Sequence, residues 1–281
     1  MKLVMTLLVR NAEEILAANI DFHRRQGVDF FIITNNRSED ATVAIAEDYV
    51  RSGIAELLHE DDDDYAQARW VTRMARRAAS VHHADWVVNN DDDEFWHSPD
   101  GTLREMLEAV PSDQDGLVVD RFNHPPVWNQ DDGDFAETMM YREARSLNAL
   151  GRSLPPKLCH RGFTDIIVAQ GNHAATREET ELRTRAAPEL MISHFPVRGF
   201  AAMERKIALG GAAYARNTEL APSIGETWRW LYGLHQASEL RAWYDAQCLS
   251  AEAISTGLAE GTLLYDDIVS RVLGSRATAD A

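Results

Sequence analysis

Short apolar segments alternate with amphipathic segments over the first 120 residues, and this alternation constrains the fold more than any other feature of the chain. Gly27 and Gly53 stand where two of the amphipathic segments should stop as helices. The pattern predicts strands at 3–9, 28–34, 54–59 and 86–90, with helices at 12–26, from Ser38 or Asp40 to 53, and at 65–81. This alternation predicts an α/β fold with a mostly parallel, Rossmann-like sheet flanked by helices.

Length, charge and cysteine content narrow the class of protein. A chain of 281 residues suits one large α/β domain with an appended helical piece. The formal net charge of −17 argues against nucleic acid as a partner and repels anionic nucleotides at long range, so a metal or nearby Arg and Lys residues must supply the attraction. Cys159 and Cys248 lack the spacing of a zinc site. The early apolar run at 3–9 is too short to span a bilayer and lacks the small-residue cleavage site of a signal peptide, which predicts a cytoplasmic protein.

Four consecutive carboxylates, Asp91 to Glu94, follow the fourth predicted strand and precede two aromatic residues. Adjacent carboxylates repel by about 1 kcal/mol per pair in water, and by more where water is excluded. The run is therefore either a solvated acidic loop or the site of a cation. Asp91 and Asp93 are expected to point the same way in an extended segment, and their hard oxygens suit Mg²⁺ or Mn²⁺ with phosphate as a further ligand.

The position of this run favours a binding site. Ligands of open parallel sheets bind beyond the carboxyl ends of the strands. The loops after the first, second and fourth predicted strands carry Arg10 with Asn11, Asn35 with Asn36, and the acidic run. No GxGxxG follows the first strand and no P-loop motif occurs in the sequence, which argues against two common nucleotide-binding folds.

Four blocks of sequence resemble the family 2 glycosyltransferases, most closely a bacterial subgroup with a DxDEFW signature. The blocks are MTLLVRNAEEIL, IITNNRSEDAT, ADWVVNNDDDEFW and ISHFPVRGFAAMERK, spread over roughly residues 3–217. The resemblance implies a GT-A fold, a nucleotide-sugar donor and a divalent Mn²⁺ or Mg²⁺ held by Asp91 and Asp93. Many relatives carry DDGSxDGT where this chain has NNRSEDAT, which leaves the donor base open.

Further site residues are predicted on the same basis. His194 follows a short apolar segment and is predicted as a third metal ligand, although a histidine in that place also serves as a core or capping residue. Glu94, Asp165 and the acidic residues 131–134 are candidates for the base that takes the acceptor proton, and each could equally be structural. The residues predicted to bind the nucleotide or its diphosphate are Arg10, Asn11, Asn35, Asn36, Asp40, Asp92, Arg198 and Lys206.

The second half of the chain is less regular. A fifth strand is expected at 116–120, strands return at 165–169 and 190–193, and the proline-rich stretch 124–157 is either an acceptor-binding loop or a surface excursion. Helices are expected at 200–217, 227–237 and 251–260. We expect a GT-A domain at 1–217, with a nucleotide-binding half at about 1–120 and an acceptor-side half at 121–217, a helical extension at 218–275 and a tail at 276–281.

These observations predict a metal-dependent glycosyltransferase that moves a sugar from a nucleotide-sugar donor to a hydroxyl of a saccharide or related acceptor, for a surface glycan. A cytoplasmic enzyme of this kind could associate peripherally with the inner face of the membrane. Two alternatives stay open: a metal-dependent phosphoryl or nucleotidyl enzyme, and a noncatalytic nucleotide-sugar-binding module. The reaction products distinguish all three.

Overall fold

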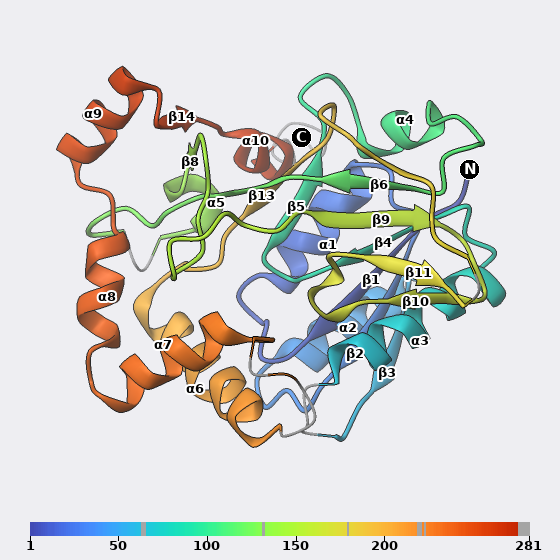
Figure 1. The fold of residues 1–281 in the computed structure, drawn as a ribbon, viewed down its shortest axis with the longest axis horizontal. Coiled ribbons are helices and arrows are strands. Elements are labelled where there is room, and N and C mark those ends of the chain that lie inside the picture. Colours follow the sequence, from blue (N-terminus) through green and yellow to red (C-terminus); the bar gives the residue numbers. More distant parts are fainter. Residues whose placement is uncertain (63–65, 131–132, 179, 218–220, 222, 275–281) are drawn as a thin grey trace. The chain divides into compact units, whose positions relative to one another are not determined.

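The structure is a computed structural model that describes residues 1–62, 66–130, 133–178, 180–217, 221 and 223–274 (Figure 1). The chain divides into two compact units. Unit 1 contains Met1–Asp62, Ala66–Arg121 and Pro155–Ile192, and the described parts of 122–154 and 193–274 belong to unit 2. The predicted domain boundary at residue 217 stays a prediction, and the predicted tail at 276–281 lies outside the described residues.

A seven-stranded mixed sheet forms the centre of unit 1, with the strand order β12-β6-β9-β4-β1-β2-β3. Strands β4, β1, β2 and β3 are parallel, and β9 is antiparallel to both of its neighbours. The predicted α/β class and mainly parallel sheet are confirmed. The strands are β1 (Leu3–Val9), β2 (Phe30–Asn35), β3 (Ala55–His59), β4 (Trp86–Asn90), β6 (Gly116–Val119), β9 (Lys157–Arg161) and β12 (Thr184–Ala186).

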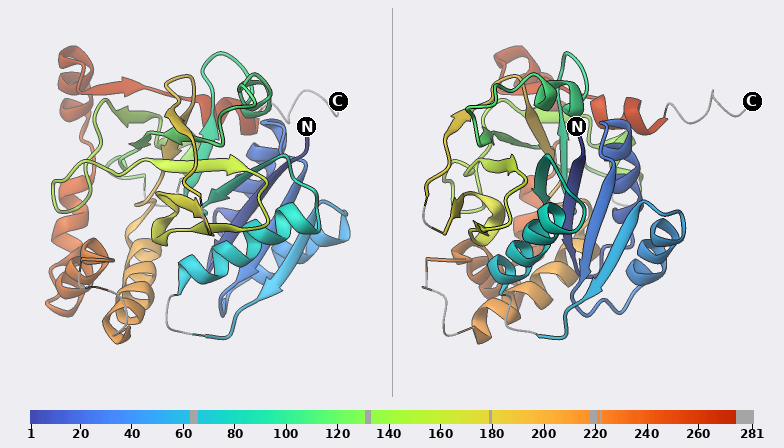
Figure 2. Two further views of the ribbon diagram at one scale, coloured as in Figure 1. Left: turned by 45° about the vertical axis from the view of Figure 1, so that its right-hand side comes forward. Right: turned by 90° about the vertical axis from the view of Figure 1, so that its right-hand side faces the viewer.

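Helices cover both faces of the parallel strands. From β1 through β3 the chain steps outward in one direction, and it then returns to place β4 on the other side of β1. Because crossovers between parallel strands are right-handed, α1 (Leu16–Arg25) and α2 (Thr42–Arg51) share one face and α3 (Gln67–Ser80) covers the other (Figure 2). The core beneath α3 contains Met74 and Ala78 packed with Val4, Ile32 and Val87. All three helices were predicted, with ends that differ by a few residues.

Shorter elements complete unit 1. Helix α4 (Leu103–Glu108) begins with a capping box formed by Thr102 and Glu105. An antiparallel pair, β10 (Ile166–Val168) and β11 (Ala175–Arg177), encloses the 3₁₀ turn η1 (Gln170–Asn172). Strand β5 (Glu94–His97) follows β4 after a tight turn. Strands β7 (Arg121–Asn123) and β13 (Met191–His194) lie where the chain passes from unit 1 to unit 2.

Unit 2 is mainly helical, as predicted for the C-terminal part of the chain. Its core includes Met203, Ile207, Leu231, Leu240 and Tyr244. Trp228 and Tyr232 pack against this core. The helices are α5 (Phe135–Thr138), α6 (Phe200–Arg216), α7 (Glu226–Gln236), α8 (Leu240–Gln247), α9 (Ala251–Glu260) and α10 (Ile268–Gly274), with the antiparallel strands β8 (Tyr141–Glu143) and β14 (Leu263–Tyr265).

Within the described part of the chain, no helix combines the length and apolar character needed to cross a membrane.

Candidate active site

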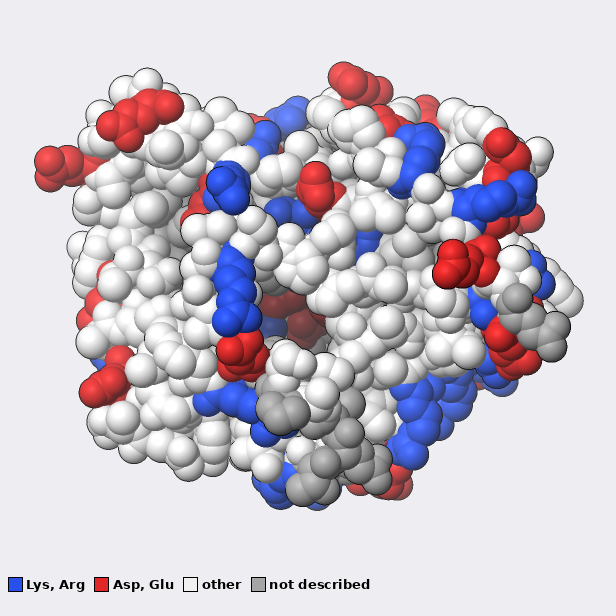
Figure 3. All heavy atoms as spheres, in the orientation of Figure 1, with Lys and Arg blue, Asp and Glu red and all other residues white. Residues whose placement is uncertain are grey.

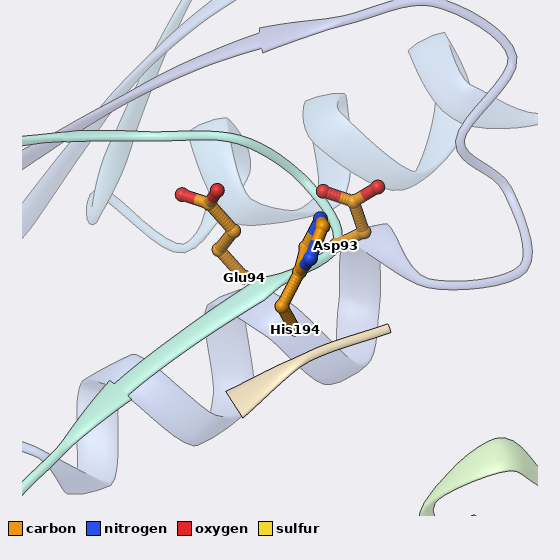
Figure 4. A group of neighbouring side chains, drawn as sticks. All are labelled: Asp93, Glu94 and His194. Carbon is orange, nitrogen blue, oxygen red and sulfur yellow. The ribbon is translucent and has the colours of Figure 1, made fainter. Parts of the chain in front are cut away.

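The acidic run forms the turn between β4 and β5, at the carboxyl end of the parallel strands (Figure 4). The backbone N–H of Glu94 donates to the carbonyl of Asp91 at 3.2 Å, so the segment is a tight turn. The expectation that Asp91 and Asp93 share one side of an extended segment is therefore wrong. The second half of the run is buried, as its place before two aromatic residues suggests: Asp93 is 4% exposed and Glu94 is fully buried. Asp91 and Asp92 are half-buried.

Two polar residues of α1 hold this turn in place. The Asn19 amide donates to the carbonyls of Asp92 and Glu94, both at 2.9 Å. His23 accepts the Trp96 backbone N–H at its Nε2 at 2.9 Å, and its Nδ1 contacts the Asn19 carbonyl at 2.8 Å. Burial lowers the pKa of His23 to about 3, so the ring is neutral at pH 7. Sequence reasoning missed both residues. The available signal was an Asn and a His one turn apart on an otherwise apolar helix face.

Two cations of the chain itself compensate the carboxylates. Lys157 Nζ lies 2.5 Å from Asp91 Oδ2 and 3.1 Å from Glu94 Oε1, with its side chain 1% exposed. Arg121 Nη1 donates to Glu94 Oε1 at 2.8 Å. Burial raises the pKa of Glu94, and the charges of Lys157 and Arg121 oppose that rise. Part of the counter-charge expected at this run is therefore supplied by the protein.

Asp91 is held by two further donors. Asn172 Nδ2 donates to Asp91 Oδ1 at 3.1 Å, and Gln67 Nε2 reaches the same oxygen at 3.3 Å. Gly171 and Asn172 both have positive φ, 78° and 60°, which glycine and asparagine tolerate best. The Gly171 N–H donates to Gln67 Oε1 at 3.0 Å and so ties this turn to the start of α3. Both oxygens of Asp91 therefore have partners within unit 1.

A buried polar chain positions the strand that carries Lys157. Thr6 donates to Asn89 Oδ1 at 2.9 Å, and Asn89 Nδ2 contacts His160 Nε2 at 3.0 Å. Nδ1 of His160 contacts the Arg161 carbonyl at 2.8 Å. Burial lowers the pKa of His160 to about 4, which keeps the ring neutral and allows it to accept from Asn89. The chain links β1, β4 and β9, and it fixes β9 beside the acidic turn.

One buried oxygen of the turn lacks a donor. Among the described residues, no hydrogen-bond donor reaches Glu94 Oε2, and the same holds for the buried Oδ1 of Asn172. A buried polar atom without a partner costs roughly 1–3 kcal/mol, and more when it is charged. A bound cation would remove that cost at Glu94, since carboxylate oxygens are the ligands that Mg²⁺ and Mn²⁺ prefer. The donor set therefore fits a divalent metal.

Asp93 and Glu94 present their carboxylates at the turn after β4, and both could serve as ligands of a divalent metal (Figure 4). Asp93 is a predicted metal ligand, whereas Glu94 was predicted as a base. His194, the third predicted ligand, belongs to unit 2. Its role as a metal ligand stays a prediction.

The tautomer of His194 is fixed within unit 2. Asn123 directs its Nδ2 to Glu143 Oε2 at 3.1 Å and to the Leu147 carbonyl at 3.0 Å, so its Oδ1 faces His194. The contact of 2.8 Å between that oxygen and His194 Nδ1 requires the proton on Nδ1. The lone pair of the neutral ring then lies on Nε2, the arrangement that metal-binding histidines use.

The predicted nucleotide-binding residues after β1 and β2 tie neighbouring loops to one another. Asn11 donates its backbone N–H to Ser38 Oγ at 2.9 Å, and its Oδ1 accepts from the Glu39 N–H at 2.8 Å. Asn35 Oδ1 accepts from the Ser38 N–H at 3.1 Å. The Asn36 amide donates to the carbonyls of Glu60 and Asp62, at 3.1 and 2.8 Å.

Asp40 accepts the backbone N–H of Thr42 at 3.0 Å near the start of α2. The contacts of Asn11, Asn35, Asn36 and Asp40 hold the loops after β1, β2 and β3 together. These loops lie at the carboxyl end of the parallel strands, where the acidic turn also begins. Arg10 directly follows β1 at the carboxyl end of the strands, and it is half-buried. Contact of these residues with a nucleotide stays a prediction.

The remaining predicted residues lie elsewhere in their units. Asp165 pairs with Arg177 Nε at 2.9 Å, at the end of the β10–β11 pair away from Asn172, and this contact lowers the pKa of Asp165. In unit 2, Arg198 Nη1 donates to the Phe195 carbonyl at 3.0 Å, and Lys206 Nζ lies 5.8 Å from the Trp228 ring centroid. Of the other candidate acids, Asp131 and Asp132 lie outside the described residues, and Asp134 caps α5.

The acidic excess is not gathered into one field on the face drawn in Figure 3. Basic and acidic side chains form small interspersed groups there. Ion pairs such as Arg77 with Glu56, at 2.6 Å, bring opposite charges together in unit 1. Attraction of an anionic ligand must accordingly come from charges close to the site.

The chain is similar in structure to several solved proteins. A crystal structure of S. aureus TarS 1-349 in complex with UDP has 13% sequence identity and a TM-score of 0.46, covering 98% of this chain and 91% of that chain. The complex of the same protein with UDP-GlcNAc has 11% identity and a TM-score of 0.45, with 92% of each chain covered. M. tuberculosis glucosyl-3-phosphoglycerate synthase in complex with Mn²⁺, UDP and glucosyl-3-phosphoglycerate has 17% identity and a TM-score of 0.29, covering 43% of this chain and 44% of that chain.

No protein-family model and no curated protein matches the sequence. At these scores the structural likenesses assign neither a family nor an activity to the chain.

Proposed function

We propose that the protein is a metal-dependent glycosyltransferase of the GT-A type, which transfers a sugar from a nucleotide-sugar donor to a hydroxyl acceptor. The observation that carries the proposal is the buried acidic turn at the carboxyl edge of the parallel strands, with a Glu94 oxygen that no described donor reaches. Support also comes from the four blocks of sequence that resemble family 2 glycosyltransferases, which include this turn.

Asp93 and Glu94 of unit 1 would hold the metal. For His194, predicted as a further ligand, Nε2 would be the donor atom. A bound divalent ion supplies Lewis-acid stabilisation of the negative charge that develops on the diphosphate leaving group. Asp91 is the least available ligand of the predicted set in this conformation, because Lys157, Gln67 and Asn172 already engage its oxygens.

The residues of the chain have separate tasks in this reaction. Asn19 and His23 hold the acidic turn rigid, so that its carboxylates do not have to reorganise when charge develops. The loops joined by Asn11, Asn35 and Asn36 would border the nucleotide, and Arg198 and Lys206 would approach the diphosphate. We further propose Mn²⁺ or Mg²⁺ as the metal and a surface glycan as the product, made in the cytoplasm or at the inner face of the membrane.

The base that takes the acceptor proton is Glu94 or Asp165 in the predicted set. Arg177 lowers the pKa of Asp165, which weakens it as a base. Burial raises the pKa of Glu94, which suits a base, but its Oε2 is also suited to a metal. The two uses of Glu94 exclude each other, because a ligated oxygen cannot also accept the proton.

The test is a product assay with a panel of nucleotide sugars, with and without Mn²⁺. A glycosyltransferase releases a nucleoside diphosphate and a glycosylated acceptor, or free sugar when water replaces the acceptor. Release of phosphate or pyrophosphate would instead indicate a phosphoryl or nucleotidyl enzyme. Binding without turnover would indicate a noncatalytic module. A thermal-shift screen selects the donor first, since a ligand at 100 times its dissociation constant stabilises the protein by about 2.7 kcal/mol.

A further inference from the structure

Lys157 occupies the place in the acidic turn where a cation is required. It begins β9, and the pairing of β9 with β6 places it opposite Val119. Its ammonium bridges two carboxylates of the turn, Asp91 at 2.5 Å and Glu94 at 3.1 Å. Burying a lysine at 1% exposure is costly unless its charge is matched, and here two carboxylates match it.

Lys157 changes the charge that a divalent ion would meet at the turn. Asp91, Asp92, Asp93 and Glu94 contribute four negative charges when ionised, and Lys157 and Arg121 contribute two positive charges. Removal of Lys157 would make the net charge of this group of side chains more negative by one unit. The ammonium therefore repels a metal bound to the turn, and it also takes up an oxygen of Asp91 that could otherwise be a ligand.

We propose that Lys157 is a resident counter-ion that orders the acidic turn before metal binds and weakens the affinity of the turn for a divalent metal on its own. The inference rests on the proposed function for the identity of the ligands. If the turn binds the metal only weakly, the diphosphate of the donor would supply the further ligands that tight binding needs. Metal and donor would then bind together. A lysine that only filled space would leave the metal affinity unchanged.

The experiment is a Mn²⁺ titration of the intact protein without nucleotide, followed by the electron paramagnetic resonance signal of free Mn²⁺. Lys157→Met should bind Mn²⁺ at least about tenfold more tightly than the wild type, because a positive charge next to the ion is removed. Lys2→Met is the matched control in unit 1, since it makes the same charge change near the Phe30 ring, away from the turn. Its dissociation constant should stay within about twofold of the wild type.

Unchanged or weaker Mn²⁺ binding in a folded Lys157→Met protein would overturn the inference. Folding is checked by circular dichroism. Should Lys157→Met not fold, Arg121→Met removes the other cation on Glu94 and must also tighten Mn²⁺ binding, or the inference fails. A second readout is the Mn²⁺-induced rise in melting temperature, which should be larger in Lys157→Met than in the wild type.

The outcome is separable from that of the proposed function. A wild-type protein that shows no reaction with any nucleotide sugar refutes the glycosyltransferase, whatever Lys157→Met does with Mn²⁺. A wild-type enzyme that turns over a nucleotide sugar, with no change of Mn²⁺ affinity in Lys157→Met, refutes the counter-ion role alone.

Discussion

Asn19→Ala should destabilise the protein markedly, because one amide of α1 holds the backbone of the acidic turn. Its Nδ2 donates to the carbonyls of Asp92 and Glu94, and its Oδ1 accepts from Asn90 Nδ2 at 3.2 Å. The Glu94 carbonyl keeps a second donor, Asn90 at 3.1 Å, so the main losses are at Asp92 and at the Asn90 amide. At roughly 1–3 kcal/mol for each buried group left unsatisfied, we expect a loss of about 2–4 kcal/mol.

The assay is urea denaturation followed by circular dichroism. Asn19→Asp should be at least as damaging as Asn19→Ala, because it directs a buried carboxylate at two carbonyl oxygens. Arg24→Ala is the control on the same helix, where the exposed side chain should change stability by less than about 0.5 kcal/mol. An Asn19→Ala protein as stable as the Arg24→Ala protein would refute the account of how the turn is held.

Three further predictions concern single groups. If Glu94 is a metal ligand, Glu94→Gln should weaken Mn²⁺ binding at least about tenfold. If Glu94 is instead the base, Glu94→Gln should lower turnover and leave the Mn²⁺ affinity unchanged. A Mn²⁺ titration and a turnover assay on the same variant distinguish the two roles. The free energy of unfolding should fall as the pH falls from 7 to 5. Burial lowers the pKa of His23 to about 3 and that of His160 to about 4, from the ordinary value of 6.5. Between pH 7 and pH 5 these two rings therefore gain protons only in the unfolded chain, which favours unfolding. Each ring contributes about 1.4 kcal/mol per pH unit below 6.5, and urea midpoints that do not change between pH 7 and pH 5 would contradict this. Asp165→Asn removes an ion pair with Arg177 that solvent screens, so it should change stability little and leave Mn²⁺ affinity intact. A large loss of Mn²⁺ affinity would show that Asp165 belongs to the site.

The strongly periodic part of the fold was predictable from the sequence. Strands β1 and β4 match the predicted ranges, and β2 and β3 differ by one or two residues at their ends. Apolar runs bounded by Gly, Asn and Asp carry that information locally. Strand β9 was missed because its sequence, KLCHR, places a buried Lys and a buried His in a strand. Their partners lie on β4 and in the acidic turn, so the local pattern resembles a loop.

The site was predictable in outline. The position and burial of the acidic run followed from its place between an apolar strand and two aromatic residues. The turn geometry and the counter-ion did not follow, because they depend on contacts between distant residues. Lys157 meets Asp91 across 66 positions of sequence, and Asn19 meets Asp92 across 73. No spacing rule connects residues that only the folded sheet brings together.

Anomalous X-ray diffraction from a crystal of the protein soaked with Mn²⁺ and a nucleoside diphosphate tests whether the turn after β4 holds a metal. We expect a manganese peak within bonding distance of Asp93 and Glu94, with the diphosphate as a further ligand. A manganese peak elsewhere, or a diphosphate bound away from the turn after β4, would contradict this expectation.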